Sequence, residues 1–140
     1  ITVETKGTPV AIMTAFSLGC PVVVARRDNH FTEGPLVSIN YVTASSKRIQ
    51  TMSLSKRAVK EGERALIVDD FMKGGGTAGG MRDLLKEFNV EVVGTGVVIA
   101  TREPEKKRIS DYTPLLFLEQ VDEAEGKIEL SPAEWILDKT

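Results

Sequence analysis

The sequence predicts an α/β fold in which helices flank a mostly parallel central sheet. Short apolar runs that are typical of buried strands alternate with segments of helical periodicity, as in consecutive βαβ units. Glycine-rich and charged stretches separate these runs where loops are expected. With 140 residues, of which 41% are hydrophobic and 27% charged, the chain is long enough to fill one core. We therefore expect a single domain over residues 1–140.

A strand, a helix and a second strand are expected at the start of the chain. Residues 1–3 are strand-like, and because a strand this close to an end usually has something before it, we expect a fragment. Thr8 followed by Pro9 is typical of a helix N-cap and first helical residue, and Gly19 of a helix end. The apolar run 21–25 indicates a strand buried on both faces. The buried face of the helix is expected to hold Ile12, Ala15 and Phe16.

The middle of the chain predicts a hairpin, a strand, a glycine loop and a helix. Alternating apolar residues on either side of a polar tip indicate a small mobile hairpin over residues 37–54. Residues 64–68 predict a buried strand, which Asp69 and Asp70 close before the glycine-rich segment 73–78. The apolar stripe of the following helix consists of Met81, Leu84, Leu85 and Phe88.

Further strands are expected towards the C-terminus. The apolar runs 90–100 and 115–118 predict two buried strands, and a turn over residues 122–126 precedes a short strand at 127–130. Because the crossovers of βαβ units are right-handed and join parallel strands, the sheet is expected to be mostly parallel.

Composition excludes several classes of function. No apolar run approaches the ~20 residues that a transmembrane helix needs, and no signal pattern opens the chain, so we expect a soluble, cytoplasmic protein without a membrane partner. The single cysteine, Cys20, is expected to be a buried, inert thiol. The single histidine, His30, lacks a second histidine to share a metal and is expected on a surface loop. We expect no catalytic residue and no metal held directly by the protein.

Charge is distributed unevenly along the chain. A net charge of −2 argues against a surface that binds nucleic acid throughout. From Gly34 to Lys60, however, the sequence contains no Asp or Glu, so anionic partners are expected there. A solvated basic face that is balanced by acids elsewhere in the fold accounts for the same pattern equally well. The cations of this basic stretch are Lys47, Arg48, Lys56, Arg57 and Lys60.

Three polar segments follow predicted strands. Each of them comes at the C-terminal end of a predicted strand: residues 5–7, the pair Arg26 and Arg27, and residues 69–77. Ligands of parallel sheets bind beyond these ends, so we expect the segments to converge on one site. The glycine-rich turn offers backbone N–H groups at a helix N-terminus, which suits a phosphate. Adjacent carboxylates suit sugar hydroxyls or a divalent cation carried by the ligand, as in a ribose with a 5-phosphate and a Mg-bound pyrophosphate.

The acidic pair and its glycines differ from several better-known loops. Their spacing is neither that of a nucleoside-triphosphate loop nor that of a dinucleotide fingerprint. Two neighbouring aspartates alone are more often a turn or a helix cap, but the glycines that follow favour a binding site. A phosphate-accepting receiver domain also begins with an acidic pair, yet it requires a phosphoacceptor aspartate after a later strand. The strand from Val90 ends instead in residues 98–102, Val-Ile-Ala-Thr-Arg.

Residues 65–77 resemble the phosphoribosyl pyrophosphate motif of type I phosphoribosyltransferases, in which two acids follow an apolar strand and precede Thr-Gly-Gly-Thr. Gly74 replaces the usual Thr, which removes a hydroxyl but leaves the backbone cradle. The resemblance extends over nearly the whole chain and implies a flexible hairpin over residues 37–54. It implies that phosphoribosyl pyrophosphate is bound by Asp69, Asp70, Phe71, Met72, Lys73, Gly74, Gly75, Gly76, Thr77 and Ala78. It further implies pyrophosphate contacts from Thr5, Lys6, Gly7 and Arg27, and loop residues Tyr41, Lys47 and Arg48.

A more specific resemblance is to the family of bacterial purine operon repressors. It rests on segments beyond the general motif, including residues 3–7, 38–42, 48–54 and 69–73. This resemblance implies a dimeric repressor of purine biosynthesis genes. The repressor is expected to release operator DNA when it binds phosphoribosyl pyrophosphate. It is also expected to have an N-terminal winged-helix domain, which is absent here. The alternative is a purine phosphoribosyltransferase. Because the hairpin offers no carboxylate for acid or base chemistry and no aromatic follows residue 100 before Tyr112, we expect a sensor without enzymatic activity. Tyr41 is either a residue that closes over the ligand or a packing residue of the hairpin.

Overall fold

The elements of the fold follow the predicted order. The computed structural model describes residues 1–27, 34–43 and 47–139. None of the helices in these ranges has the length and apolar character that crossing a bilayer requires. In chain order the elements are β1 (Thr2–Val3), α1 (Gly7–Leu18), β2 (Val24–Ala25), β3 (Leu36–Val42), β4 (Ile49–Ser55), β5 (Arg64–Met72), α2 (Gly76–Glu87), β6 (Glu91–Thr101), β7 (Thr113–Asp122), β8 (Lys127–Pro132) and α3 (Glu134–Leu137).

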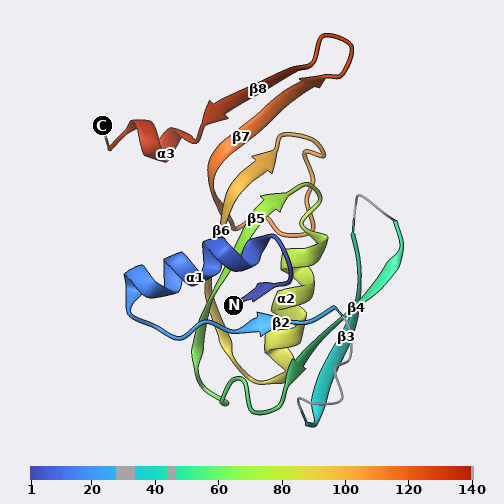
Figure 1. The fold of residues 1–140 in the computed structure, drawn as a ribbon, viewed down its shortest axis with the longest axis vertical. Coiled ribbons are helices and arrows are strands. Elements are labelled where there is room, and N and C mark those ends of the chain that lie inside the picture. Colours follow the sequence, from blue (N-terminus) through green and yellow to red (C-terminus); the bar gives the residue numbers. More distant parts are fainter. Residues whose placement is uncertain (28–33, 44–46, 140) are drawn as a thin grey trace.

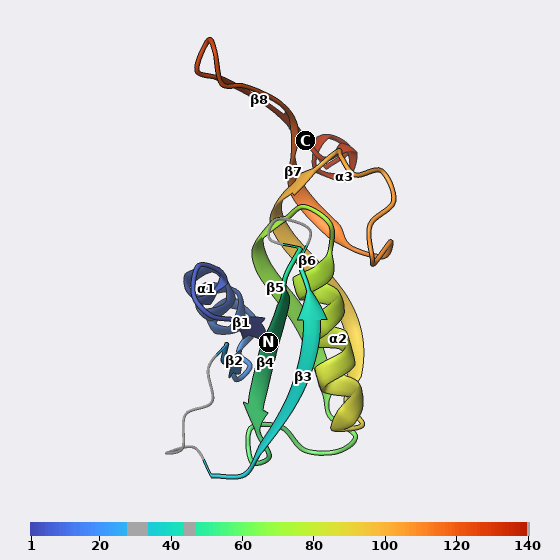
Figure 2. The same cartoon turned by 90° about the vertical axis from the view of Figure 1, so that its right-hand side faces the viewer.

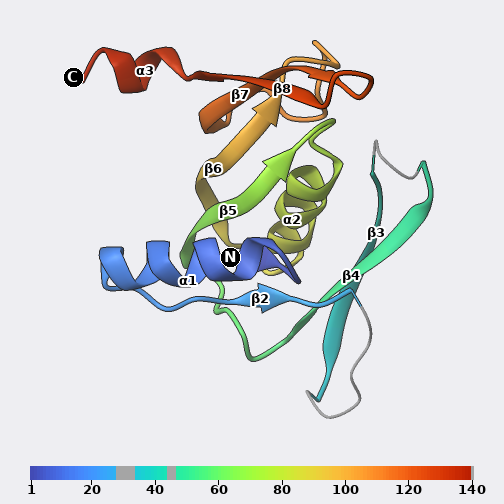
Figure 3. The same ribbon diagram turned by 45° about the horizontal axis from the view of Figure 1, so that its top comes forward.

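The central sheet is mostly parallel, as predicted. Strands β5, β6 and β7 are parallel neighbours, and β8 pairs antiparallel with β7. On the other side of β5, the Val68 N–H donates a 2.9 Å hydrogen bond to the Ile1 carbonyl, and β1 pairs in parallel with β2. β8 and α3 therefore lie at the far end of the sheet from β2 (Figure 3). The C-terminal ends of β1, β2 and β5 come close together, which creates the edge where a site was expected.

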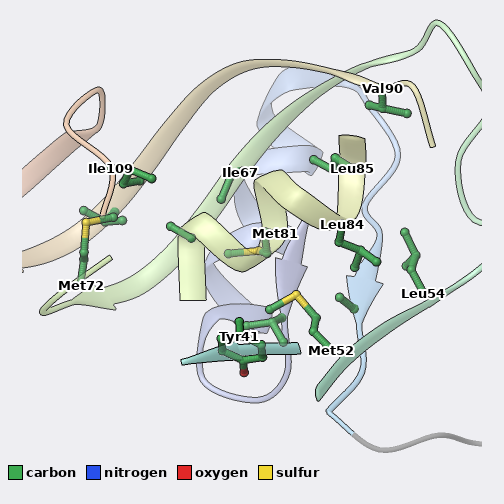
Figure 4. Packing of buried hydrophobic residues seen from close by; sticks show 14 of the residues in the cluster. Tyr41, Met52, Leu54, Ile67, Met72, Met81, Leu84, Leu85, Val90 and Ile109 are labelled. Atoms are coloured by element: carbon green, nitrogen blue, oxygen red, sulfur yellow. The ribbon is translucent and has the colours of Figure 1, made fainter. Parts of the chain in front are cut away.

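Helices cover both faces of the sheet (Figures 1 and 2). α1 packs against β5 from one side, and α2 lies on the other side between the sheet and the β3–β4 hairpin. The main core lies around α2, because its apolar stripe meets the sheet and the hairpin (Figure 4). The fully buried side chains of this core include Met52 from the hairpin, Ile67 from the sheet, and Met81, Leu84 and Leu85 from α2.

The hairpin is an independent antiparallel pair, with Leu36 opposite Ser55 and Val42 opposite Ile49. It joins β2 through two reciprocal 2.8 Å hydrogen bonds between the main chains of Arg26 and Ser53. Its seven-residue strands span roughly 23 Å. The basic stretch is therefore split, because Lys47 and Arg48 precede β4 whereas Lys56, Arg57 and Lys60 follow it.

The N-terminal part differs from the prediction in several places. Lys6, not Thr8, is the N-cap of α1, and the strand predicted at 21–25 is reduced to β2. Ala11 and Ala15 are buried, whereas Ile12 is 46% and Phe16 81% exposed. Small side chains let α1 approach β5 closely, so the larger apolar residues face outwards. Cys20 is exposed, not buried as predicted, because the residues around it pair with no strand.

The later elements also differ from the prediction. β5 continues beyond the predicted 64–68 to Met72, so the aspartate pair lies on the strand, because β6 pairs with β5 as far as Ala100 opposite Met72. α2 begins at Gly76, before its apolar stripe, and the short α3 was not predicted. The turn at residues 122–126 is confirmed, with the Asp122 carboxylate accepting N–H hydrogen bonds from Ala124 and Glu125. His30 lies outside the described residues.

Candidate functional site

A cavity of about 170 Å³ lies at the C-terminal end of β5, where the glycine loop turns into α2. The segment after β2, the hairpin and the glycine loop all contribute to its wall, so the structure brings together segments that are far apart in the sequence. The loop residues were predicted, as was Arg27, whereas Thr43 and Gln50 of the hairpin were not. The lining residues are Arg27, Thr43, Gln50, Asp69, Phe71, Met72, Lys73, Gly74, Gly75, Gly76, Thr77 and Ala78.

The glycine loop exposes main-chain donors to this cavity. Gly75 is the N-cap of α2 and has a φ of 74°, a left-handed conformation that glycine adopts without strain. No side chain caps the helix, and its first intrahelical bond runs from the Gly79 N–H to the Gly75 carbonyl at 2.8 Å. The N–H groups of the first turn therefore have no intrahelical acceptor and lie at the positive end of the helix dipole. This arrangement binds an anion such as a phosphate group.

Gly76 is where the hairpin packs on the loop. A Cβ atom at this position would lie 3.1 Å from the carbonyl carbon of Val42 and closer still to its oxygen. Such approaches do not occur for real side chains, so only glycine permits this contact. The main chain of β3 thus rests directly on the first residue of α2.

Asp69 is a buried acid at the floor of the cavity. Its side chain is 7% exposed, and Oδ1 accepts a 3.0 Å hydrogen bond from the Asp70 N–H. Burial, reinforced by the neighbouring Asp70 side chain, raises the pKa of Asp69 from 3.8 to about 7, and Arg27 opposes this shift. Asp70 is half-buried and does not line the cavity.

The predicted pyrophosphate residues divide into two groups. A Cβ at Gly7 would lie 2.8 Å from Asp69 Oδ1, so the start of α1 abuts the buried acid. Thr5 and Lys6 are exposed and do not line the cavity. Glu4, which was not predicted, holds the neighbouring segment, since its carboxylate accepts hydrogen bonds from the Arg27 N–H at 2.7 Å and from Arg26 Nη1 at 3.0 Å.

The three predicted loop residues are not equivalent. Tyr41 is 2% exposed and packs against Gly80, where a Cβ would lie 3.0 Å from the ring, so it is a packing residue of the hairpin. Lys47 and Arg48 are exposed at the end of the hairpin that carries Thr43 and Gln50. The only sequence signal for Gln50 was its place in the alternating pattern of the hairpin.

The comparison with protein families agrees with this geometry. Residues 1–130 match the model of the phosphoribosyl transferase domain. The chain belongs to this family. The adenine phosphoribosyltransferase of Giardia lamblia has the same fold, with a TM-score of 0.74, 16% identity and coverage of 85% of this chain and 68% of that one. At this identity the likeness concerns the fold alone.

The sequence relatives of the chain include regulators and an enzyme. A purine biosynthesis transcriptional repressor of Bacillus subtilis is 50% identical over 93% of this chain and 46% of its own length. A purine biosynthesis transcriptional activator of Lactococcus lactis is 40% identical over 99% of this chain and 51% of its own length. A xanthine phosphoribosyltransferase of Lactococcus lactis is 30% identical, over 96% of this chain and 70% of the enzyme. The chain thus spans about half the length of the regulators.

Proposed function

We propose that the chain is the effector-binding domain of a transcriptional regulator of purine biosynthesis genes, and that its effector is phosphoribosyl pyrophosphate. The observation that carries this proposal is the cavity that combines the uncapped N-terminus of α2 with the buried Asp69. Main-chain N–H groups at a helix N-terminus bind a phosphate, and a neighbouring carboxylate accepts hydrogen bonds from sugar hydroxyls, so the cavity suits a ligand that carries both groups. The 50% identity to a repressor of purine biosynthesis supports the regulatory role.

In this proposal each segment binds one part of the effector. The amides of residues 74–78 hold the 5-phosphate, and Asp69 and Asp70 accept hydrogen bonds from the ribose hydroxyls. Residues 5–7 and Arg27 bind the pyrophosphate, which brings Mg²⁺ with it. Among the described residues, no group of three or more His, Cys, Asp or Glu gathers to hold a metal by itself.

Operator DNA is the partner proposed for the whole regulator, in which a winged-helix domain would precede this one. Lys47 and Arg48 lie at the end of the hairpin that lines the cavity, whereas Lys56, Arg57 and Lys60 lie at the other end. Effector binding would therefore act on DNA contacts first through Lys47 and Arg48. Linkage requires that DNA weaken effector binding by the same factor. Equal operator affinity of the full-length regulator with and without saturating effector would contradict this mechanism.

A homodimer is the proposed assembly. The exposed apolar side of α1 supports it, with Ile12 46%, Met13 62% and Phe16 81% exposed. Such a contiguous patch is typical of an interaction surface. Light scattering of the wild type and of Phe16→Glu tests this proposal, and a monomeric wild type would contradict it.

Transferase activity is the second candidate, because the xanthine phosphoribosyltransferase of Lactococcus lactis aligns with 96% of the chain. Against it, the described part of the hairpin supplies no carboxylate to the cavity. The decisive assay incubates the protein with phosphoribosyl pyrophosphate, Mg²⁺ and adenine, guanine, hypoxanthine or xanthine. We expect calorimetry to detect effector binding and chromatography to detect no nucleotide. Turnover at an ordinary enzymatic rate would favour the enzyme, and absence of binding would reject both candidates.

A further inference from the structure

A segment outside the cavity packs on the back of the glycine loop. It is the connection between β6 and β7, residues 102–112. Two of its residues, Arg108 and Ile109, contact the loop, and we call this pair the buttress of the glycine loop. The Arg108 N–H donates a 2.9 Å hydrogen bond to the Gly74 carbonyl. A Cβ at Gly75 would lie 3.4 Å from Ile109 Cγ1 and 3.5 Å from the Arg108 nitrogen. Neither buttress residue lines the cavity, so both contact the loop from outside the space that a ligand would fill.

Arg108 of the buttress also packs against the first turns of α2. A Cβ at Gly79 would lie 2.6 Å from Cδ and Nε of Arg108, so the arginine side chain crosses the helix where a glycine leaves room. Its guanidinium pairs with Asp83. Because this pair is on the surface, it contributes little to stability, but it orients the side chain along the helix.

A second set of contacts fixes the connection itself. Arg82 Nη1 lies 2.6 Å from Asp111 Oδ1, and Arg82 Nη2 donates to the Thr95 hydroxyl at 2.9 Å. α2, β6 and the connection are thereby tied together just beyond the buttress. Ile109 is 7% exposed and belongs to the main core, so the buttress has a rigid base.

We propose that Arg108 and Ile109 are positioning residues that hold the glycine loop in its anion-binding conformation. Three consecutive glycines have the largest conformational freedom of any backbone, and ordering them only on binding would weaken the ligand. A loop that is already held by its neighbours avoids this cost. The inference rests on the proposed function, since it assigns the phosphate of the effector to residues 74–78.

The test compares Arg108→Ala and Ile109→Ala with the control Lys106→Ala, which removes a cation from an exposed position of the same connection. Ile109→Val is included because truncation to alanine opens a cavity in the core. Calorimetry measures binding of ribose 5-phosphate and of inorganic pyrophosphate, and hydrogen exchange measures the amides of residues 74–76. Hydrogen exchange needs no ligand, so it tests the buttress independently of the proposed function.

We expect ribose 5-phosphate to bind about tenfold more weakly to Ile109→Ala. The loss should be smaller in Ile109→Val, and also in Arg108→Ala, which keeps the main-chain hydrogen bond to Gly74 and loses only the side-chain contacts with α2. Pyrophosphate affinity should stay unchanged, loop amides should exchange about tenfold faster, and Lys106→Ala should behave as the wild type. Wild-type exchange and affinity in the buttress variants would overturn the inference. Equal losses for both ligands with faster exchange throughout the chain would also overturn it, since they indicate general unfolding. Failure of the wild type to bind either ligand would reject the proposed function alone.

Discussion

The hydroxyl of Tyr41 donates a 3.0 Å hydrogen bond to Oε1 of Gln50, which links the core under the hairpin to the wall of the cavity. Tyr41 is buried against α2, and Gln50 faces it from the opposite strand. Packing of the hairpin on the helix therefore also determines where one cavity side chain lies. A change in the packing of Tyr41 should therefore also change the position of Gln50 in the wall of the cavity.

Tyr41→Phe tests this link. Removing the hydroxyl deletes one hydrogen bond and should lower the free energy of unfolding by about 1 kcal/mol. The released Gln50 should also lower effector affinity slightly, an effect that Gln50→Asn should reproduce. Urea denaturation and calorimetry measure the two effects. Tyr112→Phe is the control outside the cavity, and an equal loss of effector affinity there would contradict the link.

Gly76→Ala should damage both stability and binding. The new methyl group would collide with the Val42 carbonyl and force the hairpin away from the loop. Overpacking of this kind costs about 1–3 kcal/mol. Gly96→Ala is the matched control, because no atom lies within 4 Å of a Cβ added there. Equal destabilisation of the two variants in urea would refute the close contact between hairpin and helix.

Asp70→Asn should weaken the effector while the fold persists. Hydrogen bonds from ribose hydroxyls to a charged acceptor contribute roughly 1.5–3 kcal/mol each, and the amide removes the charge. Because Asp70 is only half-buried, the thermal midpoint should change little. Calorimetry measures the effector affinity of Asp70→Asn and of the control Asp138→Asn, at the end of α3. The control loses the same charge, so it separates the local effect from a change in total charge. Unchanged affinity would remove Asp70 from the site.

Asp69 should make stability depend on pH. Its pKa is about 7 in the folded chain and 3.8 in the unfolded chain, so between these values the folded state binds more protons. The free energy of unfolding should therefore fall as pH rises from about 4 to 7, by up to about 1.4 kcal/mol per pH unit, and level off above. Urea denaturation at several pH values measures this slope. It should be reduced in Asp69→Asn, and an identical slope in that variant would assign the effect to other groups.

Much of the fold was predictable because its signals are local. The glycine loop before a helical stripe and the alternating hairpin each depend on neighbouring residues, and both lie where they were predicted. The outward orientation of Phe16 was not predictable, because which face of α1 is buried depends on small residues meeting β5. The extension of β5 through Asp70 depends on pairing with β6, a partner that follows much later in the chain.

The part of the candidate site that depends on the order of the elements could be predicted. Arg27 and the loop residues share a sheet edge that the order of elements dictates. Thr43 and Gln50 join them only because the hairpin folds across α2, an arrangement that its own sequence does not encode. The buttress at Arg108 was likewise beyond sequence analysis, since its contacts with Gly74 and Gly79 connect separate loops and helices.

The contact between Gly76 and Val42 has a consequence for how such domains diverge. On the Val42 side, the surface that touches the helix consists of peptide atoms, which every amino acid possesses. The exposed side chains of the hairpin can thus be exchanged over evolutionary time without loss of this contact. Related domains can therefore differ in the surface of the hairpin while they keep the same contact between the hairpin and α2.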